Sequence, residues 1–167
     1  MAVVDFPAAA AALAAAVREE AGDMKPREFI SQLENDKIVA AIRDAEKLTS
    51  GEIRVFISRK IITEVVATAQ AEFNRLGMLH TQHRNAVLIF VAPASQKFAV
   101  IGDTGVHEKC GQPFWDELAT EMSGHFAKSD FSEGLIHGIR RAGKILALHF
   151  PVLPGDNNEL PDKVETD

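Results

Sequence analysis

The side chains best suited to bind a ligand or transfer a proton stand at the ends of predicted strands. Glu52 begins one apolar run and Asp103 follows another, while Arg84 and Asn85 directly precede a third. Two carboxylates and an amide oxygen are hard ligands of the kind that calcium and magnesium prefer. A structural interpretation stays open, because acidic residues at strand ends also form simple ion pairs with arginine, and Asp-Thr-Gly is ordinary turn chemistry.

Hydrophobic periodicity predicts the strands that would position these residues. From Glu52 to Ser58 every second side chain is aliphatic, at Ile53, Val55 and Ile57, which indicates a strand with one strongly apolar face. Residues 86–92 form a nearly continuous apolar run, typical of a central strand covered on both faces. Residues 97–102 form a third strand after a Pro-Ala-Ser-Gln loop, and an apolar stripe from Ile62 to Leu76 indicates a helix between the first two strands.

The order of these elements predicts the topology of the sheet. A right-handed crossover makes the first two strands parallel, and the short loop makes the third antiparallel to the second. With four residues between Ala92 and Lys97, paired residue numbers sum to 189, so Asp103 lies opposite Ala86. The start of the first strand, at Glu52, belongs to the same edge. The sequence therefore predicts that the four polar residues named above converge there.

Three further helices are expected around the sheet. The sequence from Ser31 to Glu34 has the spacing of a capping box and precedes a helical stripe that runs to Leu48. Pro113 suits the first turn of a second helix. Asp130 is placed to cap a third, which runs to about His149.

The last of these helices carries a stripe of small residues, Gly134, Gly138 and Ala142, at four-residue spacing. Each glycine costs a helix about 1 kcal/mol relative to alanine, so the stripe indicates close packing. The neighbour is either another element of the same chain or, alternatively, a second copy in a homodimer.

Histidines and backbone groups offer further candidates near Asp103. His107 follows Asp103 by four residues and could face the same site. The helical turn that begins there has N–H groups that could hold an anion. His80 and His83 have a spacing compatible with a metal pair, with a solvated loop as the alternative.

Composition restricts the classes of function. The chain has 167 residues, of which 46% are hydrophobic and 25% charged, as in an ordinary globular protein. A net charge of −6 without a basic cluster excludes nucleic acid as an expected partner. The single cysteine, Cys110, excludes an intrachain disulfide. No segment approaches the ~20 apolar residues of a membrane span, and we expect a cytoplasmic protein that is a monomer or weak homodimer.

The chain divides into three predicted parts. Residues 1–25 include an Ala-rich stretch with strong helix propensity and few large side chains, which we interpret as a helical extension. Residues 26–151 contain all the strands and helices described above and form one α/β domain. Residues 152–167 are rich in proline and polar residues and are expected to be a disordered tail.

Five motifs in order resemble the TPM-domain family, in particular its small bacterial branch with a single domain. They are TSGEIRV at 49–55, FNRLGM at 73–78, Thr81 with RNAVLI at 84–89, IGDTGV at 101–106, and Phe131 followed by Gly134 and Leu135. The resemblance covers about residues 31–151. It implies an α/β/α sandwich around a small mixed β-sheet.

The resemblance also implies possible activities. The family includes a plant thylakoid-lumen protein, implicated in photosystem II repair, for which acid phosphatase activity is claimed, and members reported to bind calcium. Its acidic cluster corresponds here to Asp103 and Glu52.

Three hypotheses follow from the residues and the resemblance together. The first is an accessory or protein-interaction module that binds calcium or magnesium through Asp103, Glu52 and Asn85. The second is a metal-dependent acid phosphatase, in which Asp103 holds a metal or acts as nucleophile, Arg84 clamps phosphate and His107 is the general acid. The third is a structural scaffold, in which the polar residues form an ion-pair network.

Overall fold

The computed structural model describes residues 25–158 and 160–167. The predicted Ala-rich helical extension, apart from Lys25, lies outside the described residues. No helix within the described residues is long and apolar enough to cross a membrane.

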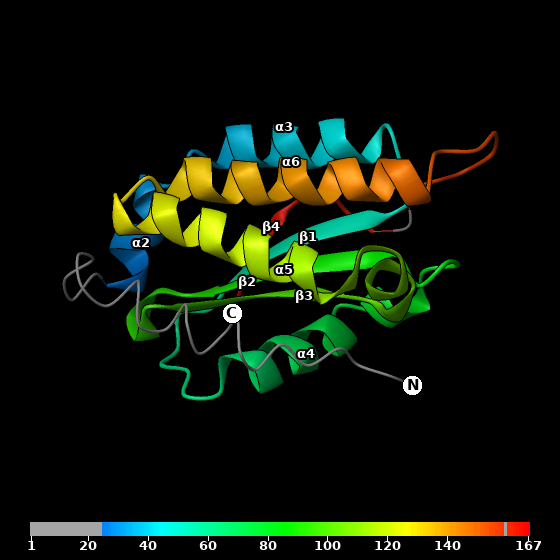
Figure 1. Cartoon of the computed structure of the whole chain (residues 1–167). Helices are drawn as coiled ribbons and strands as arrows, with labels where there is room; N and C mark the ends of the chain where they lie inside the picture. Colours follow the sequence, from blue (N-terminus) through cyan, green and yellow to red (C-terminus); the bar gives the residue numbers. More distant parts are fainter. Residues whose placement is uncertain (1–24, 159) are drawn as a thin grey trace.

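A mixed four-stranded sheet forms the centre of the protein (Figure 1). Its strands are β1 (Glu52–Ile57), β2 (Ala86–Ala92), β3 (Lys97–Gly102) and β4 (Val164–Thr166), arranged in the order β3-β2-β1-β4. β1 and β2 are parallel and β3 is antiparallel to β2, as predicted. Val87 pairs with Gly102, which confirms the predicted register. All residues of β1 and β2 are buried, because helices cover both faces of the sheet.

Helices pack on both faces of the sheet and give the predicted α/β/α sandwich (Figure 1). On one face lie α3 (Asn35–Glu46), α5 (Thr104–Ala127) and α6 (Phe131–His149), and on the other lies α4 (Val65–Arg75). The short helix α2 (Pro26–Gln32) precedes α3. Short 3-10 turns, η1 (Met78–His80) and η2 (Pro93–Ser95), complete the connections.

The small-residue stripe of α6 packs inside the molecule. A Cβ atom on Gly134 would lie 2.6 Å from the ring of Phe126, and one on Gly138 would lie 2.7 Å from the sulfur of Met122, both on α5. Ala142 is fully buried in the core. Close packing of α6 against α5 therefore accounts for these small residues.

The predicted start of α3 is wrong. Ser31 belongs to α2, where its hydroxyl donates to the carbonyl of Glu28 at 2.8 Å. Glu34 instead precedes α3, and its backbone N–H donates to Ser132 Oγ at 2.9 Å. The reason is that Pro26 begins a separate helix, anchored by the buried ring of Phe29, which the capping-box spacing does not reveal.

The other two helix starts lie where the sequence placed them. Within α5, Gly111 adopts non-helical angles, with φ of 69°, and the second half of the helix begins just before Pro113. Asp130 directly precedes α6, but among the described residues its side chain makes no capping hydrogen bond. The position was predicted correctly, whereas the capping interaction was not.

The expected disordered tail is wrong for its last residues, which form β4 beside β1. Val164 packs against the core, and Glu165 forms a salt bridge with Arg54 of β1. The strand has three residues, which is too short to show periodicity in the sequence.

Candidate functional site

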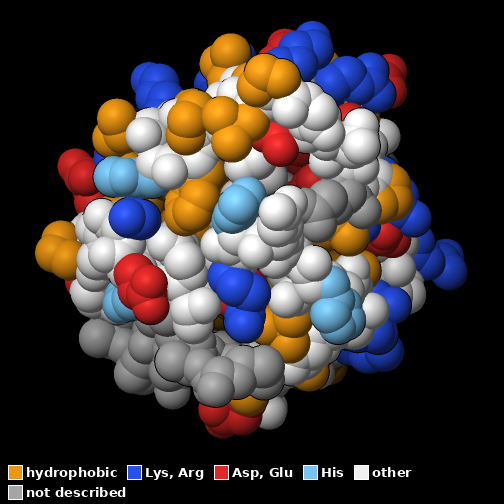
Figure 2. Space-filling model, turned by 90° about the vertical axis from the view of Figure 1, so that its right-hand side faces the viewer, with side chains coloured by type: hydrophobic (Ala, Val, Ile, Leu, Met, Phe, Trp, Pro, Cys, Tyr) orange, Lys and Arg blue, Asp and Glu red, His pale blue; other side chains and the backbone are white. Residues whose placement is uncertain are grey.

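The candidate site lies where β1 and β2 begin and β3 ends, at the right-hand end of the sheet in Figure 1. Glu52 pairs with Ala86 across β1 and β2. The backbone N–H of Asp103 donates to the carbonyl of Ala86 at 2.9 Å. Figure 2 views this end and shows histidine, basic and acidic side chains mixed on its coloured surface, so neither sign of charge dominates.

Arg84 and Asp103 form a bidentate ion pair at this edge. Arg84 Nε donates to Asp103 Oδ2 and Nη2 donates to Oδ1, both at 2.7 Å. The side chain of Asp103 is only 2% exposed, whereas that of Arg84 is 35% exposed. The hydrogen bonds to Asp103 raise the pKa of Arg84. A planar guanidinium matches both carboxylate oxygens, which makes this the strong form of ion pair.

Asp103 also begins α5 and supplies its first capping interactions. Its Oδ1 accepts the N–H of Thr104 at 2.7 Å, and its carbonyl accepts the N–H groups of Val106 and His107, both at 3.1 Å. The N–H of Gly105 donates to the carbonyl of Arg84 at 3.0 Å. The predicted anion site at this helix start is therefore wrong, because protein oxygens already accept its N–H groups.

Gly105 allows the loop before β2 to approach the start of α5. A Cβ atom there would lie 2.5 Å from the carbonyl oxygen of His83 and 2.7 Å from that of Arg84. Arg84 itself has a left-handed backbone with φ of 52°. Asp-Thr-Gly thus has a specific role here, since it caps the helix, pairs with Arg84 and leaves space for the loop.

Glu52 and Asp103 lie on the face of the sheet that α4 covers. On that face Phe56 stacks on Phe90, with 5.5 Å between ring centroids, and the guanidinium of Arg75 from α4 lies over Phe56. Side chains alternate along a strand, so Glu52 and Ala86 point to the same side. A Cβ atom on Gly102 would meet Trp115 of α5 on the opposite side, so the next residue, Asp103, also points toward α4.

One row of the sheet therefore reads Glu52, Ala86, Asp103, all on the same face. Neighbouring strands lie about 4.8 Å apart, which separates the outer two Cα atoms by about 10 Å. Ala86 lies between these two residues in the row. Both residues are buried, with 3% of Glu52 and 4% of Asp103 exposed.

Asn85 is part of the same edge, but its side chain contacts Ser50. Its Nδ2 donates to Ser50 Oγ at 3.2 Å, and its backbone N–H donates to Thr81 Oγ1 at 3.2 Å. Its Oδ1 is buried and has no hydrogen-bond partner within residues 25–158 and 160–167. The alternation of β2 directs this side chain away from the row that holds Glu52 and Asp103.

Comparison with known proteins identifies the family. Residues 24–145 match the model of the TPM domain. The chain belongs to the TPM-domain family. It is also similar to the solution structure of the BA42 protein from the psychrophilic bacterium Bizionia argentinensis, with 39% identity and a TM-score of 0.74 over 80% of this chain and 92% of that one. Proteins of curated function offer no match.

This TPM domain carries a second acidic group that sequence reasoning missed. Glu46, at the end of α3, accepts the N–H of Ile53 through Oε1 at 2.7 Å. Its other oxygen accepts a hydrogen bond from Asn158, which also donates to Asp162 at 2.6 Å. Burial raises the pKa of Glu46 to about 9, and the hydrogen bond with Asp162 and the charge of Glu52 add to the rise.

Nothing in the local pattern distinguishes these acidic residues. Glu46 lies in a helix with several charged side chains, and Asp162 lies in the segment expected to be disordered. Only the return of the chain to β1 brings them together. A long-range contact of this kind has no signal in a single sequence.

The predicted histidines occupy different positions around the edge of the TPM domain. His107 lies in the first turn of α5, where its backbone is bonded to Asp103. His80 belongs to η1, and His83 lies in the loop that contacts Gly105. Across the described part of the chain, no group of three or more His, Cys, Asp or Glu side chains is placed to hold a metal ion.

The fit of a cation at this edge depends on Arg84. Asp103 Oδ1 already accepts from Arg84 and Thr104, whereas Oδ2 accepts from Arg84 alone. A divalent cation on Oδ2 would therefore replace the guanidinium, which is exposed enough to move into solvent. Asp103 and Glu52 are the two protein carboxylates of this row that could supply oxygen ligands to such a cation.

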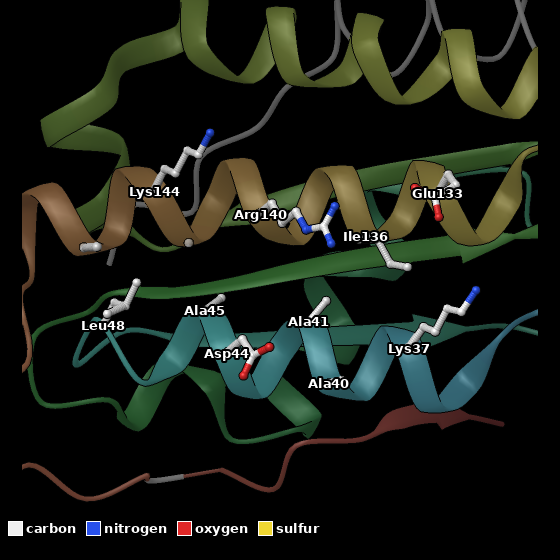
Figure 3. Close-up of a pocket in the computed structure, with 12 residues that line it drawn as sticks. Lys37, Ala40, Ala41, Asp44, Ala45, Leu48, Glu133, Ile136, Arg140 and Lys144 are labelled. Carbon is white, nitrogen blue, oxygen red and sulfur yellow. The ribbon is translucent and has the colours of Figure 1, made fainter.

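A groove of about 600 Å³ lies elsewhere, between α3 and α6 (Figure 3). Ala41, Ala45 and Gly143 are among the residues that line it. The charged side chains of Lys37 and Glu133 stand along the groove in Figure 3. Gly143 allows the close approach, since a Cβ atom there would lie 2.7 Å from that of Ala45. The groove is an apolar surface separate from the Asp103 edge.

Proposed function

We propose that this TPM domain is a protein-interaction module whose sheet edge responds to a divalent cation held by Asp103 and Glu52. The observation that carries the proposal is the shared row on the α4 face, with only Ala86 between the two carboxylate residues. Carboxylate oxygens are hard ligands that suit calcium or magnesium. Asn85 belongs to the same edge, but its side chain points to the opposite face of the sheet and therefore lies outside the proposed cation site.

In this proposal the cation and Arg84 compete for the same carboxylate. The guanidinium neutralises Asp103 when the cation is absent, so the buried charge is always compensated. Cation binding releases the Arg84 side chain to solvent and changes the surface that a partner contacts. The exchange requires little movement of the backbone, because the carbonyl of Arg84 stays bonded to Gly105.

The electrostatic surroundings support a cation more than an anion. Glu52 lies close enough to Glu46 for its negative charge to raise the pKa of Glu46. Phosphate binding, as required of an acid phosphatase, would need Arg84 to leave Asp103 and would find the first N–H groups of α5 already bonded. The phosphatase alternative, with His107 as general acid, therefore has less support from the contacts.

Calorimetric titration with calcium and with magnesium tests the proposal. We expect Asp103→Asn and Glu52→Gln to weaken cation binding, and Arg84→Met to tighten it roughly tenfold, since about 1.4 kcal/mol of competition corresponds to that factor. Glu108→Gln, on the exposed part of α5, is the matched control and should bind as the parent does.

The outcomes separate the three hypotheses. Equal cation binding by the parent and Asp103→Asn would rule out this edge as the site. A loss of stability in Asp103→Asn together with no cation binding by any variant would favour a structural scaffold. Turnover of an aryl phosphate that is lost in Asp103→Asn, and retained in Glu108→Gln, would favour the phosphatase alternative.

A further inference from the structure

The outer edge of β1 is covered by a short strand that is held mainly by polar contacts. β4 contributes three pairs to β1, from Val55 with Val164 to Ile57 with Thr166. Every residue of β1 is buried, whereas Val164 and Glu165 are half-buried and Thr166 is exposed. A core strand of the sheet thus depends on a small, peripheral strand to pair its edge.

Carboxylates at two alternate positions anchor this strand. Glu165 Oε1 accepts from Arg54 Nη1 at 3.1 Å. Asp167 accepts from Ser58 Oγ at 2.8 Å and from the backbone N–H of Arg59 at 2.7 Å, and Lys60 lies 3.3 Å from it. Because alternate residues of a strand share a face, both carboxylates point to the same side. Val164 points to the other side and packs against the core.

The contact between Arg54 and Glu165 leaves the guanidinium incompletely bonded. The side chain of Arg54 is only 4% exposed, and its Nε has no hydrogen-bond partner in the described part of the molecule. Glu165 makes a single contact with it and is shared with Lys163, whose Nζ lies 2.9 Å from the same oxygen. A carboxylate that bonded both Nε and an Nη atom would satisfy this buried charge better than β4 does.

We propose that the β1 edge is a binding site for an extended acidic segment of a partner protein, and that β4 occupies it as a displaceable strand. The segment would pair with β1 through its backbone. It would present an apolar residue to the α3 side, a carboxylate to Arg54 and a second carboxylate, two residues later, to Ser58 and Arg59. Strand addition at a sheet edge is an established mode of peptide recognition, with backbone affinity and side-chain specificity.

The charge of the edge fits this class of partner. Arg54, Arg59 and Lys60 supply three positive charges beside the β1 edge, in a chain whose net charge is −6. Because β4 belongs to the same chain as β1, it has a high effective concentration at the β1 edge. A partner segment therefore competes through the better carboxylate contact to Arg54. The proposal does not depend on cation binding at the Asp103 edge.

The test uses the full chain with its own strand weakened. In the variant Glu165→Gln with Asp167→Asn, β4 keeps its length and its apolar residue but loses both anchoring charges. The probe is a fluorescent peptide with the sequence LPDKVETD, which is that of residues 160–167. We expect fluorescence anisotropy to show binding to this variant roughly tenfold tighter than to the parent, because less of the variant has its edge occupied.

Two controls keep the proposal refutable. Asp36→Asn with Glu108→Gln changes the charge of the protein by the same amount at exposed positions outside β4, and should bind the peptide as weakly as the parent does. The peptide LPNKVQTN, which has the same length but lacks the acids, should bind about tenfold more weakly to the weakened variant. This peptide control does not require substitution of the buried Arg54.

Three results would overturn the proposal. One is equal binding of LPDKVETD to the parent and the weakened variant, and another is equal binding of the acidic and neutral peptides. The third is formation of a dimer by the weakened variant with no peptide binding, because that would indicate exchange of β4 between copies. Increased hydrogen exchange of the β1 amides in the weakened variant, reversed by the acidic peptide, is the supporting result.

Discussion

The two residues of the Arg84–Asp103 pair are unequally buried. We therefore predict that substituting each of them lowers the stability of the protein by a different amount. Arg84→Met leaves the carboxylate of Asp103 in a position that is only 2% exposed, bonded to the start of α5 alone. Asp103→Asn keeps an acceptor for the N–H of Thr104 and leaves a guanidinium that is 35% exposed and can be hydrated. The arginine substitution should therefore cost more stability than the aspartate substitution.

The magnitudes follow from the type of contact that is lost. Removing one partner of a fully buried pair costs about 3–5 kcal/mol, and the partial exposure of Arg84 reduces this to about 2–3 kcal/mol for Arg84→Met. Asp103→Asn loses charge-assisted hydrogen bonds but leaves no buried charge, so about 1–2 kcal/mol is expected. For a protein of this size each kcal/mol corresponds to about 2–4 °C in Tm.

Urea denaturation followed by tryptophan fluorescence measures both variants. Trp115 is the single tryptophan of the chain, and it is buried against Gly102, next to the pair. Lys47→Met is the matched control, because the ion pair of Lys47 with Asp44 is exposed on both sides and should contribute less than about 1 kcal/mol. If Asp103→Asn lowers the free energy of unfolding as much as Arg84→Met, the argument from unequal burial is refuted.

Two further predictions concern Glu46 and Gly105. The pKa of Glu46 is raised from 4.5 to about 9 in the folded protein. Its protonated form therefore stabilises the fold fully below pH 4.5, and this contribution is lost as the pH rises toward 9. Glu46→Gln should flatten the decline of the urea midpoint between pH 5 and 9, and an unchanged slope would contradict the assignment. Gly105→Ala should cost at least about 2 kcal/mol because its Cβ would meet the carbonyls of His83 and Arg84. By contrast, a Cβ atom on Gly124 of α5 would meet open space, so Gly124→Ala should raise the stability by up to about 1 kcal/mol. Thermal unfolding of Gly105→Ala and Gly124→Ala measures both effects.

The central part of the sheet was predictable because local signals there agree with one another. The alternation from Glu52 to Ser58 and the apolar run of β2 fix two strands, and the four-residue connection fixes the register of β3. That register brings Glu52 and Asp103 to one edge. It also determines their common face. Side chains alternate along each strand with a period of two, so residues that pair in one row point to the same side of the sheet.

The contacts at the edge were less predictable than its position. The sequence suggested an ion pair of Arg84 as one alternative, but not that Arg84 would have a left-handed backbone or that its carbonyl would accept the N–H of Gly105. The free N–H groups expected at the start of α5 are occupied for this reason. Such contacts depend on how a loop folds back over a helix, and residue type alone does not determine that path.

The C-terminal strand shows a different limit of sequence reasoning. The polar composition of residues 152–167 is typical of a disordered segment, yet three of them pair with β1. The stabilising features are on the other side of the contact, in the buried Arg54 and in the N–H of Arg59. A short strand that depends on its acceptor surface cannot be recognised from its own residues.

The two edges of this TPM domain differ in their relation to the family. Glu52, Arg84 and Asp103 lie inside residues 24–145, which match the domain, whereas β4 lies beyond them. The matched region thus contains a buried arginine, Arg54, whose carboxylate partner comes from outside it. A buried guanidinium without a charged partner is costly, so in this chain the acidic partner at the β1 edge compensates Arg54. β4 does so with one contact, and a segment that made two would bind the same edge more tightly.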